Sequence, residues 1–347
     1  MEHVREEALG EIEIVLGDRL KRRQPGRPAP DGALASVFPA SAEEVALLAR
    51  IADRYSLPLA ALGAQTTSEK RAREGRVLIR FDLMRSLWLS GADESLAEAE
   101  PGALWLELDN ELRVRGRGLT VYPTSAPRAT IGGWLAQDGV GVGSFEYGRL
   151  SENVVSADVV MPGGTLRTVG GDELHSVVGP EKGIVVRATL QTRRAEHDTP
   201  YALTIGDREK LAEAVTGIFR KEIPLWHLAF LSPEMARLRA LGEDHLLFGA
   251  YPGERGAAAE KALREVASSA GGRVLPTIEA YRAWGERFFP IAPSRPTPVL
   301  SDRAFVRVAE IPAALQTHAT QAVQGTVARS GEVLMLAFEP GEGSPTR

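Results

Sequence analysis

Apolar residues fall at helical spacing in two segments near the N-terminus, residues 4–22 and 42–52. In the second segment, Val45, Leu48 and Ala52 lie on one helical face. Ser41 and Glu44 form an S-x-x-E capping box in front of it, which satisfies amide donors in the first turn of a helix. The pattern therefore predicts one amphipathic helix in each segment.

Short apolar runs predict strands in the rest of the first half. The alternation on either side of Pro162–Gly164 predicts a β-hairpin with glycine in its turn. A helix is predicted over 103–112, and the strands are predicted at 57–62, 77–85 and 184–192. The first half is therefore expected to be α+β, with many short strands and few helices.

From residue 200 the pattern alternates between strands and longer helices. The predicted strands are 201–205, 225–231, 246–250 and 273–276, and the predicted helices are 208–220 and 255–269. This β-α-β-β-α-β order is that of a ferredoxin-like unit. Beyond it, a helix from Ile278, a helix near 311–328 and a strand at 333–338 are expected.

Glycine is concentrated between Pro123 and Gly148, a stretch that also carries large apolar side chains such as Trp134 and Phe145. Glycine lets a backbone turn sharply or approach a ligand closely. This stretch is therefore interpreted as ordered backbone wrapped around a ligand. A second small, hydroxyl-rich turn, residues 63–68, follows a predicted strand and is either an anion-binding loop or an ordinary strand connection.

Composition narrows the possible functions. The net charge of −5 argues against nucleic acid or an anionic membrane as the main partner. No apolar stretch reaches the length of a membrane span, so an integral membrane protein is not expected, and the N-terminus lacks a signal-peptide pattern. The absence of cysteine excludes disulfides and thiolate metal sites, and the expected location is the cytoplasm.

Several motifs occur in an order that resembles a known family. They are V-F-P-x-S-x-E-E-V, P-L-x-x-x-G, E-P-G, T-I-G-G-W-L-A, G-S-F-E-Y-G, V-V-M-P-G-G and G-P-E-K-G-I-V, all within residues 37–185. Together they resemble the PCMH-type FAD-binding domain of the FAD-linked oxidase, or vanillyl-alcohol-oxidase, family. The greatest similarity is to the glycolate oxidase and D-lactate dehydrogenase group, particularly its FAD-binding E subunit. The resemblance is weaker at 281–290 and 306–315.

The resemblance implies an α+β fold in which two small α+β subdomains form the FAD-binding domain and a ferredoxin-like cap domain follows. The expected division is an N-terminal helix and connector (1–33), the FAD-binding domain (34–195), a substrate or cap domain that is short relative to larger members (196–340), and a disordered tail (341–347). It also implies that backbone amides hold the FAD pyrophosphate. The implied cofactor-binding residues are Gly63, Thr66, Thr67, Thr130, Ile131, Gly132, Gly133, Gly139, Ser144, Tyr147, Gly183 and Ile184. A tight packing turn is the alternative for Gly132 and Gly133, and core packing is the alternative for Tyr147.

Three departures from the family pattern bear on the cofactor. Gln65 stands where the phosphate loop usually has a second glycine, and the loop at 179–184 is about two residues shorter than usual. No histidine lies in the loop 63–75 and the chain has no cysteine, so the resemblance implies non-covalent FAD.

The sequence leaves the catalytic acid and base unknown. Its six histidines show no metal-ligand spacing, so no metal site is predicted. Arg282 and Arg287 are candidates for binding a substrate carboxylate, because arginine binds carboxylates bidentately, although both also suit the polar side of an amphipathic helix.

The leading hypothesis is an FAD-dependent oxidoreductase subunit that oxidises a small 2-hydroxy acid by hydride transfer, beside a larger flavoprotein and an iron–sulfur protein. The alternatives are a stand-alone flavin oxidoreductase and a structural subunit that has lost FAD.

Overall fold

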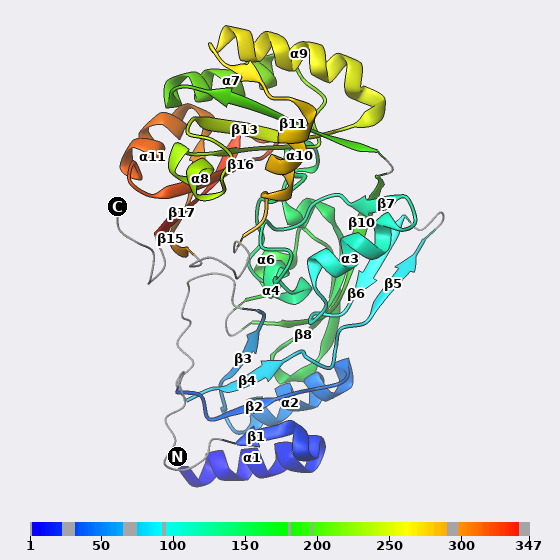
Figure 1. The fold of residues 1–347 in the computed structure, drawn as a ribbon. Helices are drawn as coiled ribbons and strands as arrows, with labels where there is room; N and C mark the ends of the chain where they lie inside the picture. Colours follow the sequence, from blue (N-terminus) through cyan, green and yellow to red (C-terminus); the bar gives the residue numbers. More distant parts are fainter. Residues whose placement is uncertain are drawn as a thin grey trace. The chain divides into compact units, whose positions relative to one another are not determined.

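The computed structural model describes residues 2–22, 32–64, 75–91, 95–179, 182–195, 197–289 and 298–339 (Figure 1). The chain forms two units, each assembled from separated segments. Unit 1 comprises residues 1–112, 126–139 and 151–193, and unit 2 comprises 113–125, 140–150 and 194–347. The glycine-rich stretch is therefore shared, since it leaves unit 1 after Gly139.

Unit 1 begins with a four-stranded sheet in the order β1-β2-β4-β3. Its strands are β1 (Leu20–Arg22), β2 (Ala35–Val37), β3 (Leu59–Leu62) and β4 (Val77–Arg80). Helices α1 (Glu2–Leu16) and α2 (Ala42–Arg54) supply apolar faces to the core of this sheet. The predicted start of α2 is confirmed, because the Ser41 hydroxyl accepts the Glu44 amide at 3.3 Å.

The second sheet of unit 1 contains strands in the order β5-β6-β10-β8-β9. Their bounds are β5 (Leu87–Ser90), β6 (Leu96–Ala99), β8 (Val154–Val160), β9 (Leu166–Val169) and β10 (Ile184–Arg194). The predicted hairpin is confirmed: β8 and β9 pair antiparallel, and Gly163 and Gly164 both have φ of +79° in the turn. Short helices α3 (Trp105–Arg113), α4 (Ile131–Leu135) and α6 (Leu174–Val177) connect these strands.

Unit 2 is built on a seven-stranded sheet in the order β14-β11-β13-β12-β16-β17-β15. Its first four strands are β11 (Asp198–Ile205), β12 (His227–Leu231), β13 (His245–Pro252) and β14 (Arg273–Val274). Helix α7 (Arg208–Arg220) connects β11 to β12, and α9 (Gly256–Ser269) connects β13 to β14. The predicted ferredoxin-like unit is confirmed, and β15 (Val299–Arg307), β16 (Ala322–Val327) and β17 (Glu332–Glu339) extend its sheet. Further short elements of this unit are β7 (Arg117–Leu119), α5 (Ser144–Tyr147), α8 (Pro233–Leu238), α10 (Thr277–Gly285) and α11 (Ile311–Thr317).

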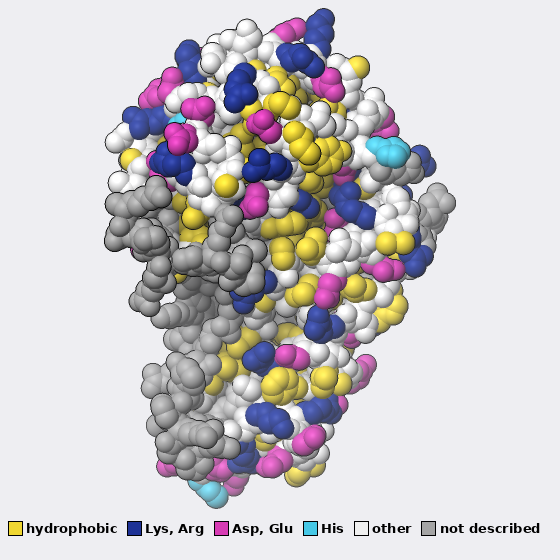
Figure 2. Space-filling view, viewed as in Figure 1, with side chains coloured by type: hydrophobic (Ala, Val, Ile, Leu, Met, Phe, Trp, Pro, Cys, Tyr) yellow, Lys and Arg dark blue, Asp and Glu magenta, His cyan; other side chains and the backbone are white. Residues whose placement is uncertain are grey.

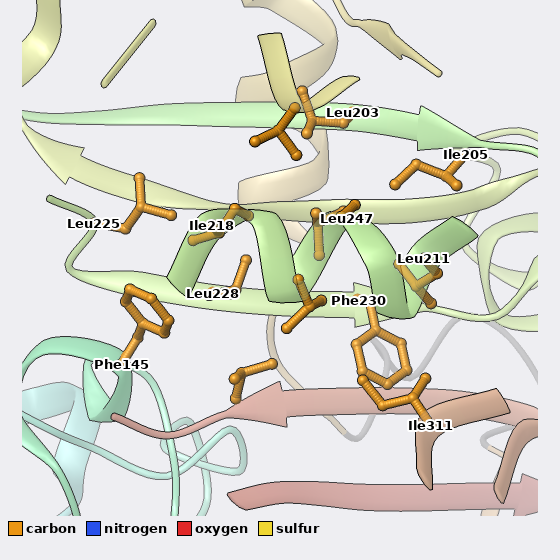
Figure 3. Packing of buried hydrophobic residues seen from close by; sticks show 14 of the residues in the cluster. Phe145, Leu203, Ile205, Leu211, Ile218, Leu225, Leu228, Phe230, Leu247 and Ile311 are labelled. Atoms are coloured by element: carbon orange, nitrogen blue, oxygen red, sulfur yellow. The ribbon is translucent and has the colours of Figure 1, made fainter. Parts of the chain in front are cut away.

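Both faces of the seven-stranded sheet are buried, so its central strands are almost wholly apolar. On one face, side chains such as Phe230 and Leu247 pack against α7, α9 and α11 (Figure 3). On the other face, Ala229 and Phe248 pack with residues of α8 and α10. Neighbouring residues along one strand thus enter different cores, as the strand period of two requires.

Three sequence predictions differ from the structure. The predicted first helix ends at Leu16. Residues Leu20–Arg22 instead form a strand that pairs antiparallel with β2 at the edge of the sheet. The predicted strand 77–85 ends at Arg80, where pairing with β3 ends. The helix predicted at 311–328 stops at Thr317, and Ala322–Val327 inserts between β12 and β17 as a strand. Its Gly325 has no room for a side chain, because a Cβ there would lie 2.1 Å from the Phe230 ring.

The core facing α7 should dominate the stability of unit 2. We expect Ile218→Ala, in the fully buried face of α7, to lower the free energy of unfolding by about 2–5 kcal/mol. The matched change Ile278→Ala removes a side chain that is 71% exposed on α10, and it should change the stability by no more than about 0.5 kcal/mol. Urea unfolding of both variants checks this, and equal losses would contradict the assigned core.

Candidate cofactor and substrate sites

Two of the loops assigned to the pyrophosphate are in direct contact within unit 1. Gly63 follows β3, and Thr130 and Gly133 lie at the start of α4. A Cβ on Gly63 would lie 2.9 Å from Thr130 Oγ1 and 3.0 Å from Gly133 Cα. A Cβ on Gly133 would lie 3.3 Å from Gly63 Cα. Both positions therefore require glycine, and the contact brings the two loops to one place.

The loop that opens α4 is fixed by hydrogen bonds to neighbouring segments. The Ile131 amide donates to Ala103 O at 2.8 Å, and the Gly132 amide donates to Pro101 O at 2.9 Å. The Gly133 amide donates to Thr130 Oγ1 at 3.3 Å. These three amides are engaged within the protein, whereas the Thr130 hydroxyl hydrogen can rotate toward a ligand.

Aromatic packing completes the support of this loop. The Trp105 indole N–H donates to Thr130 O at 3.1 Å, and the Trp105 and Trp134 rings meet edge to face with centroids 5.0 Å apart. The missing side chains of Gly63 and Gly133 leave room for the opposite loop, so both glycines are explained by packing within unit 1. The role of these loops toward a diphosphate stays a prediction.

The residues assigned to the adenine end also have packing roles in unit 1. A Cβ on Gly183 would lie 2.3 Å from Val159 Cγ1, and its amide donates to Val177 O at 2.7 Å. Ile184 begins β10 and packs against the core of the first sheet. Thr66 and Thr67 lie outside the described residues. The roles of these four residues toward FAD stay predictions.

The remaining part of the glycine-rich stretch forms a turn of unit 2. Gly143 has a φ of +90°, and the Gly141 amide donates to Ser144 Oγ at 2.9 Å. The Ser144 side chain is fully buried and closes this turn, whereas Tyr147 is half-buried. Gly139, buried at the end of the unit 1 segment, precedes this turn. Ser144 thus has a structural role whether or not it also contacts a ligand.

Arg287 lies in an aromatic setting in unit 2. Its guanidinium carbon is 4.2 Å from the centroid of the Trp284 ring and 4.0 Å from that of Phe288. Its Nε donates to the Tyr122 hydroxyl at 3.3 Å, and its NH1 donates to Trp284 O at 2.8 Å. Within the described residues these acceptors carry no charge, so the cation retains its capacity to bind an anion.

Buried polar side chains hold the backbone around Arg287. Arg239 is almost fully buried and donates to the carbonyl oxygens of Glu286 and Phe288, the latter at 2.9 Å. The Gln324 side-chain amide donates to the Arg287 carbonyl at 2.9 Å. Burial lowers the pKa of Arg239 to about 10, which the nearby Glu286 carboxylate partly opposes, so Arg239 is still charged at neutral pH. Three consecutive carbonyls are thereby fixed.

The other candidate arginine has a different environment. Arg282 is exposed on α10 and donates to the Ala240 carbonyl at 3.1 Å. The structure therefore places Arg287, but not Arg282, in the cluster with Tyr122 and Trp284. Neither role toward a substrate is established by this placement.

His227 is a candidate that the sequence pattern did not single out. It is fully buried in β12, and its Nδ1 accepts the Gly143 amide at 3.4 Å. Its proton therefore lies on Nε2, which has no hydrogen-bond partner among the described residues. Burial, with a smaller effect from Arg287, lowers the pKa of His227 to about 3, so the ring is neutral at physiological pH. An unsatisfied buried donor costs about 1–3 kcal/mol, which calls for an explanation.

Charge and metal-binding groups add little to this picture. Lys and Arg are interspersed with Asp and Glu on the face shown in Figure 2. Among the residues that the structure describes, no cluster of three or more histidine, aspartate or glutamate side chains could hold a metal ion. In the same ranges, no helix has the length and apolar character that crossing a bilayer requires.

The chain was compared with known families, sequences and structures. Residues 33–170 match the family described as FAD binding domain. The chain is 30% identical over 171 residues to a mitochondrial D-lactate dehydrogenase [cytochrome] of Arabidopsis thaliana. This alignment covers 46% of this chain and 30% of that protein. It is 27% identical over 203 residues to a D-lactate dehydrogenase of Archaeoglobus fulgidus, and this alignment covers 54% of this chain and 45% of that protein. The matches thus span less than half the length of these relatives.

The fold is shared with larger flavoproteins of known structure. A structure of alkyldihydroxyacetonephosphate synthase superposes with a TM-score of 0.78 over 96% of this chain and 77% of that chain, at 17% sequence identity. This similarity covers both units and concerns the fold alone. The cofactor assignment rests on the matched family. Residues 33–170 form an FAD-binding domain, and FAD is the cofactor of this domain.

Proposed function

We propose that this chain is an FAD-dependent oxidoreductase, or the FAD-binding subunit of one, that oxidises a small 2-hydroxy acid. The FAD-binding domain at residues 33–170 carries this proposal. The names of the relatives support the substrate class, because D-lactate is a 2-hydroxy acid. FAD, when bound, supplies the acceptor for the two electrons that leave the alcohol carbon as a hydride.

On the cofactor side, unit 1 would bind FAD without a covalent link, since the chain contains no cysteine and residues 63–75 contain no histidine. The Thr130 hydroxyl would donate to a phosphate oxygen beside the contact between Gly63 and Gly133. Gly183 and Ile184 would border the adenine end.

On the substrate side, Arg287 would bind the carboxylate. A guanidinium fork matches the two oxygens of a carboxylate, and stacking on Trp284 and Phe288 keeps the fork in one plane. Arg239 and Gln324 hold the backbone on either side, which limits the loss of conformational freedom on binding.

The chain would work beside a larger flavoprotein and an iron–sulfur protein in a complex of the glycolate oxidase or D-lactate dehydrogenase type. This assignment rests on the sequence resemblance to an FAD-binding E subunit. A stand-alone flavin oxidoreductase is the alternative within the same reaction class.

A structural subunit without FAD is the alternative from a different class. It is favoured by the amides of Ile131, Gly132 and Gly133, which already donate within the protein. Gln65, at a position where the family usually has glycine, points the same way.

One experiment separates these possibilities. The purified full chain is incubated with FAD, freed of excess, and mixed anaerobically with D-lactate or glycolate. Stoichiometric bound flavin that bleaches on mixing supports the proposal for the isolated chain. Bound flavin that bleaches only after the partner subunits are added supports the complex, and the absence of any bound flavin would overturn the proposal.

Gly133→Asp should abolish FAD uptake. The new side chain would enter the contact between Gly63 and Thr130 and place a negative charge beside the diphosphate. Gly10→Asp is the matched control, because a Cβ at Gly10 on α1 has no neighbour within 4 Å. Flavin content after gel filtration is the measurement, and circular dichroism reports whether the chain is folded. Equal flavin content in the two variants would show that this loop is not the FAD site.

Arg287→Met should weaken the use of a hydroxy acid while leaving bound FAD unchanged. Losing a charge-assisted pair costs about 1.5–3 kcal/mol, so we expect kcat/KM to fall by about 10–100-fold. Arg282→Met, at the exposed position, should change kcat/KM by less than about threefold. Steady-state kinetics in the active form of the protein gives both values, and the reverse ranking would assign the carboxylate to Arg282.

A further inference from the structure

His227 presents a polar hydrogen in the interior of unit 2 that nothing described in the protein accepts. Its side chain is completely buried, and Nε2 has no hydrogen-bond partner among the described residues. Its other nitrogen, Nδ1, is occupied by the Gly143 amide at 3.4 Å. The ring can therefore only donate through Nε2, which excludes it as a proton acceptor in this tautomer.

The surroundings of His227 identify the kind of ligand that could accept this hydrogen. The rings of His227 and Trp284 meet edge to face with centroids 5.8 Å apart, and the Arg287 guanidinium lies 4.2 Å from the same Trp284 centroid. One indole ring thus contacts both the His227 ring and the Arg287 guanidinium. Donors of these two kinds around an aromatic ring suit a ligand with several oxygen acceptors and a negative charge.

The position of His227 is held from several sides. Its ring meets Phe248 of β13 nearly at right angles, with centroids 6.4 Å apart, and its carbonyl accepts the Tyr201 hydroxyl at 3.2 Å. A Cβ on Gly249 would lie 1.9 Å from the same carbonyl oxygen, so the neighbouring strand also fits closely against it. A donor on a rigid strand is positioned before a ligand arrives, which is what selective binding requires.

We propose that the His227 Nε2–H is the second donor, with Arg287, to the oxygens of a bound 2-hydroxy carboxylate. This inference rests on the proposed function and adds a residue that would donate a hydrogen bond to a second oxygen of the substrate. Arg287 supplies the charge. His227 supplies direction, since a neutral N–H bonds only an acceptor in line with it.

Two substitutions separate the donor from the rest of the ring. His227→Asn keeps an oxygen at the Nδ1 position that can accept the Gly143 amide, but it removes the donor at Nε2. His227→Gln places a side-chain amide N–H where Nε2 was. His245→Asn is the matched control, because His245 is also buried and has an unpartnered nitrogen, Nδ1, but lies at the start of β13 among the charges of Glu234 and Asp207.

The test is isothermal titration calorimetry of the FAD-loaded full chain, with its partner subunits if these are needed for binding. Oxalate is the probe, because it offers carboxylate oxygens and has no hydride to give. Urea unfolding of each variant is measured in parallel to establish that it is folded.

We expect His227→Asn to weaken oxalate binding about tenfold or more, and His227→Gln and His245→Asn to stay within about threefold of the unsubstituted protein. Equal affinity of His227→Asn and the unsubstituted protein would overturn the inference and leave the Nε2–H facing an aromatic ring. Equal weakening by Asn and Gln would also overturn it, since the donor would then be irrelevant. If the unsubstituted protein neither binds oxalate nor oxidises any hydroxy acid, the proposed function itself fails.

Discussion

The close contact between two backbone segments of unit 1 is the constraint on which the proposed cofactor site depends. Gly63, after β3, and Gly133, at the start of α4, lie so near each other that neither has space for a Cβ. The contact exists because the Pro101 and Ala103 carbonyls anchor the α4 segment and because Trp105 and Trp134 brace it. The Ile131, Gly132 and Gly133 amides are engaged within the protein, so in the proposed site the Thr130 hydroxyl would be the group that donates to a phosphate oxygen.

In unit 2, a hydrogen-bond network holds the backbone at Arg287 in place. The buried Arg239 guanidinium donates to the carbonyls of the residues before and after Arg287. The buried Gln324 side-chain amide donates to the carbonyl of Arg287 itself. Burying Arg239 is unfavourable unless its hydrogen bonds are satisfied. The two residues also bond each other at 3.2 Å, so the network is connected. Such a network fixes a loop more firmly than apolar packing alone.

The sequence was sufficient to predict elements whose signals are local. Helix α7 was predicted with the observed bounds, and the structure shows that the Asp207 side chain caps its start by accepting the Lys210 amide. The strand β16 was mistaken for the end of a helix, because Ile311 and Leu315 have helical spacing and the change of period after Thr317 is short. The conformation of that segment depends on a strand far away in sequence, because β16 pairs antiparallel with β12.

The same distinction applies to the sites. Gly63 and Gly133 were predicted as cofactor-binding residues because a glycine in a motif is visible in the sequence. Their mutual contact explains why both are glycine, and their role toward FAD stays a prediction. His227 could not be predicted, since a lone histidine within the apolar strand β12 has no periodic signature. Its significance depends on Gly143, 84 residues away, and on the missing partner of Nε2. That a donor lacks a hydrogen-bond partner can be recognised only once its neighbours in the folded structure are known.

Hydrogen–deuterium exchange with and without FAD tests the central claim most directly, because it reports where the cofactor binds without assuming any activity. The account predicts that FAD slows amide exchange in peptides that cover residues 59–64 and 126–139 of unit 1. Slower exchange confined to the seven-stranded sheet of unit 2, with these two segments unchanged, would contradict it.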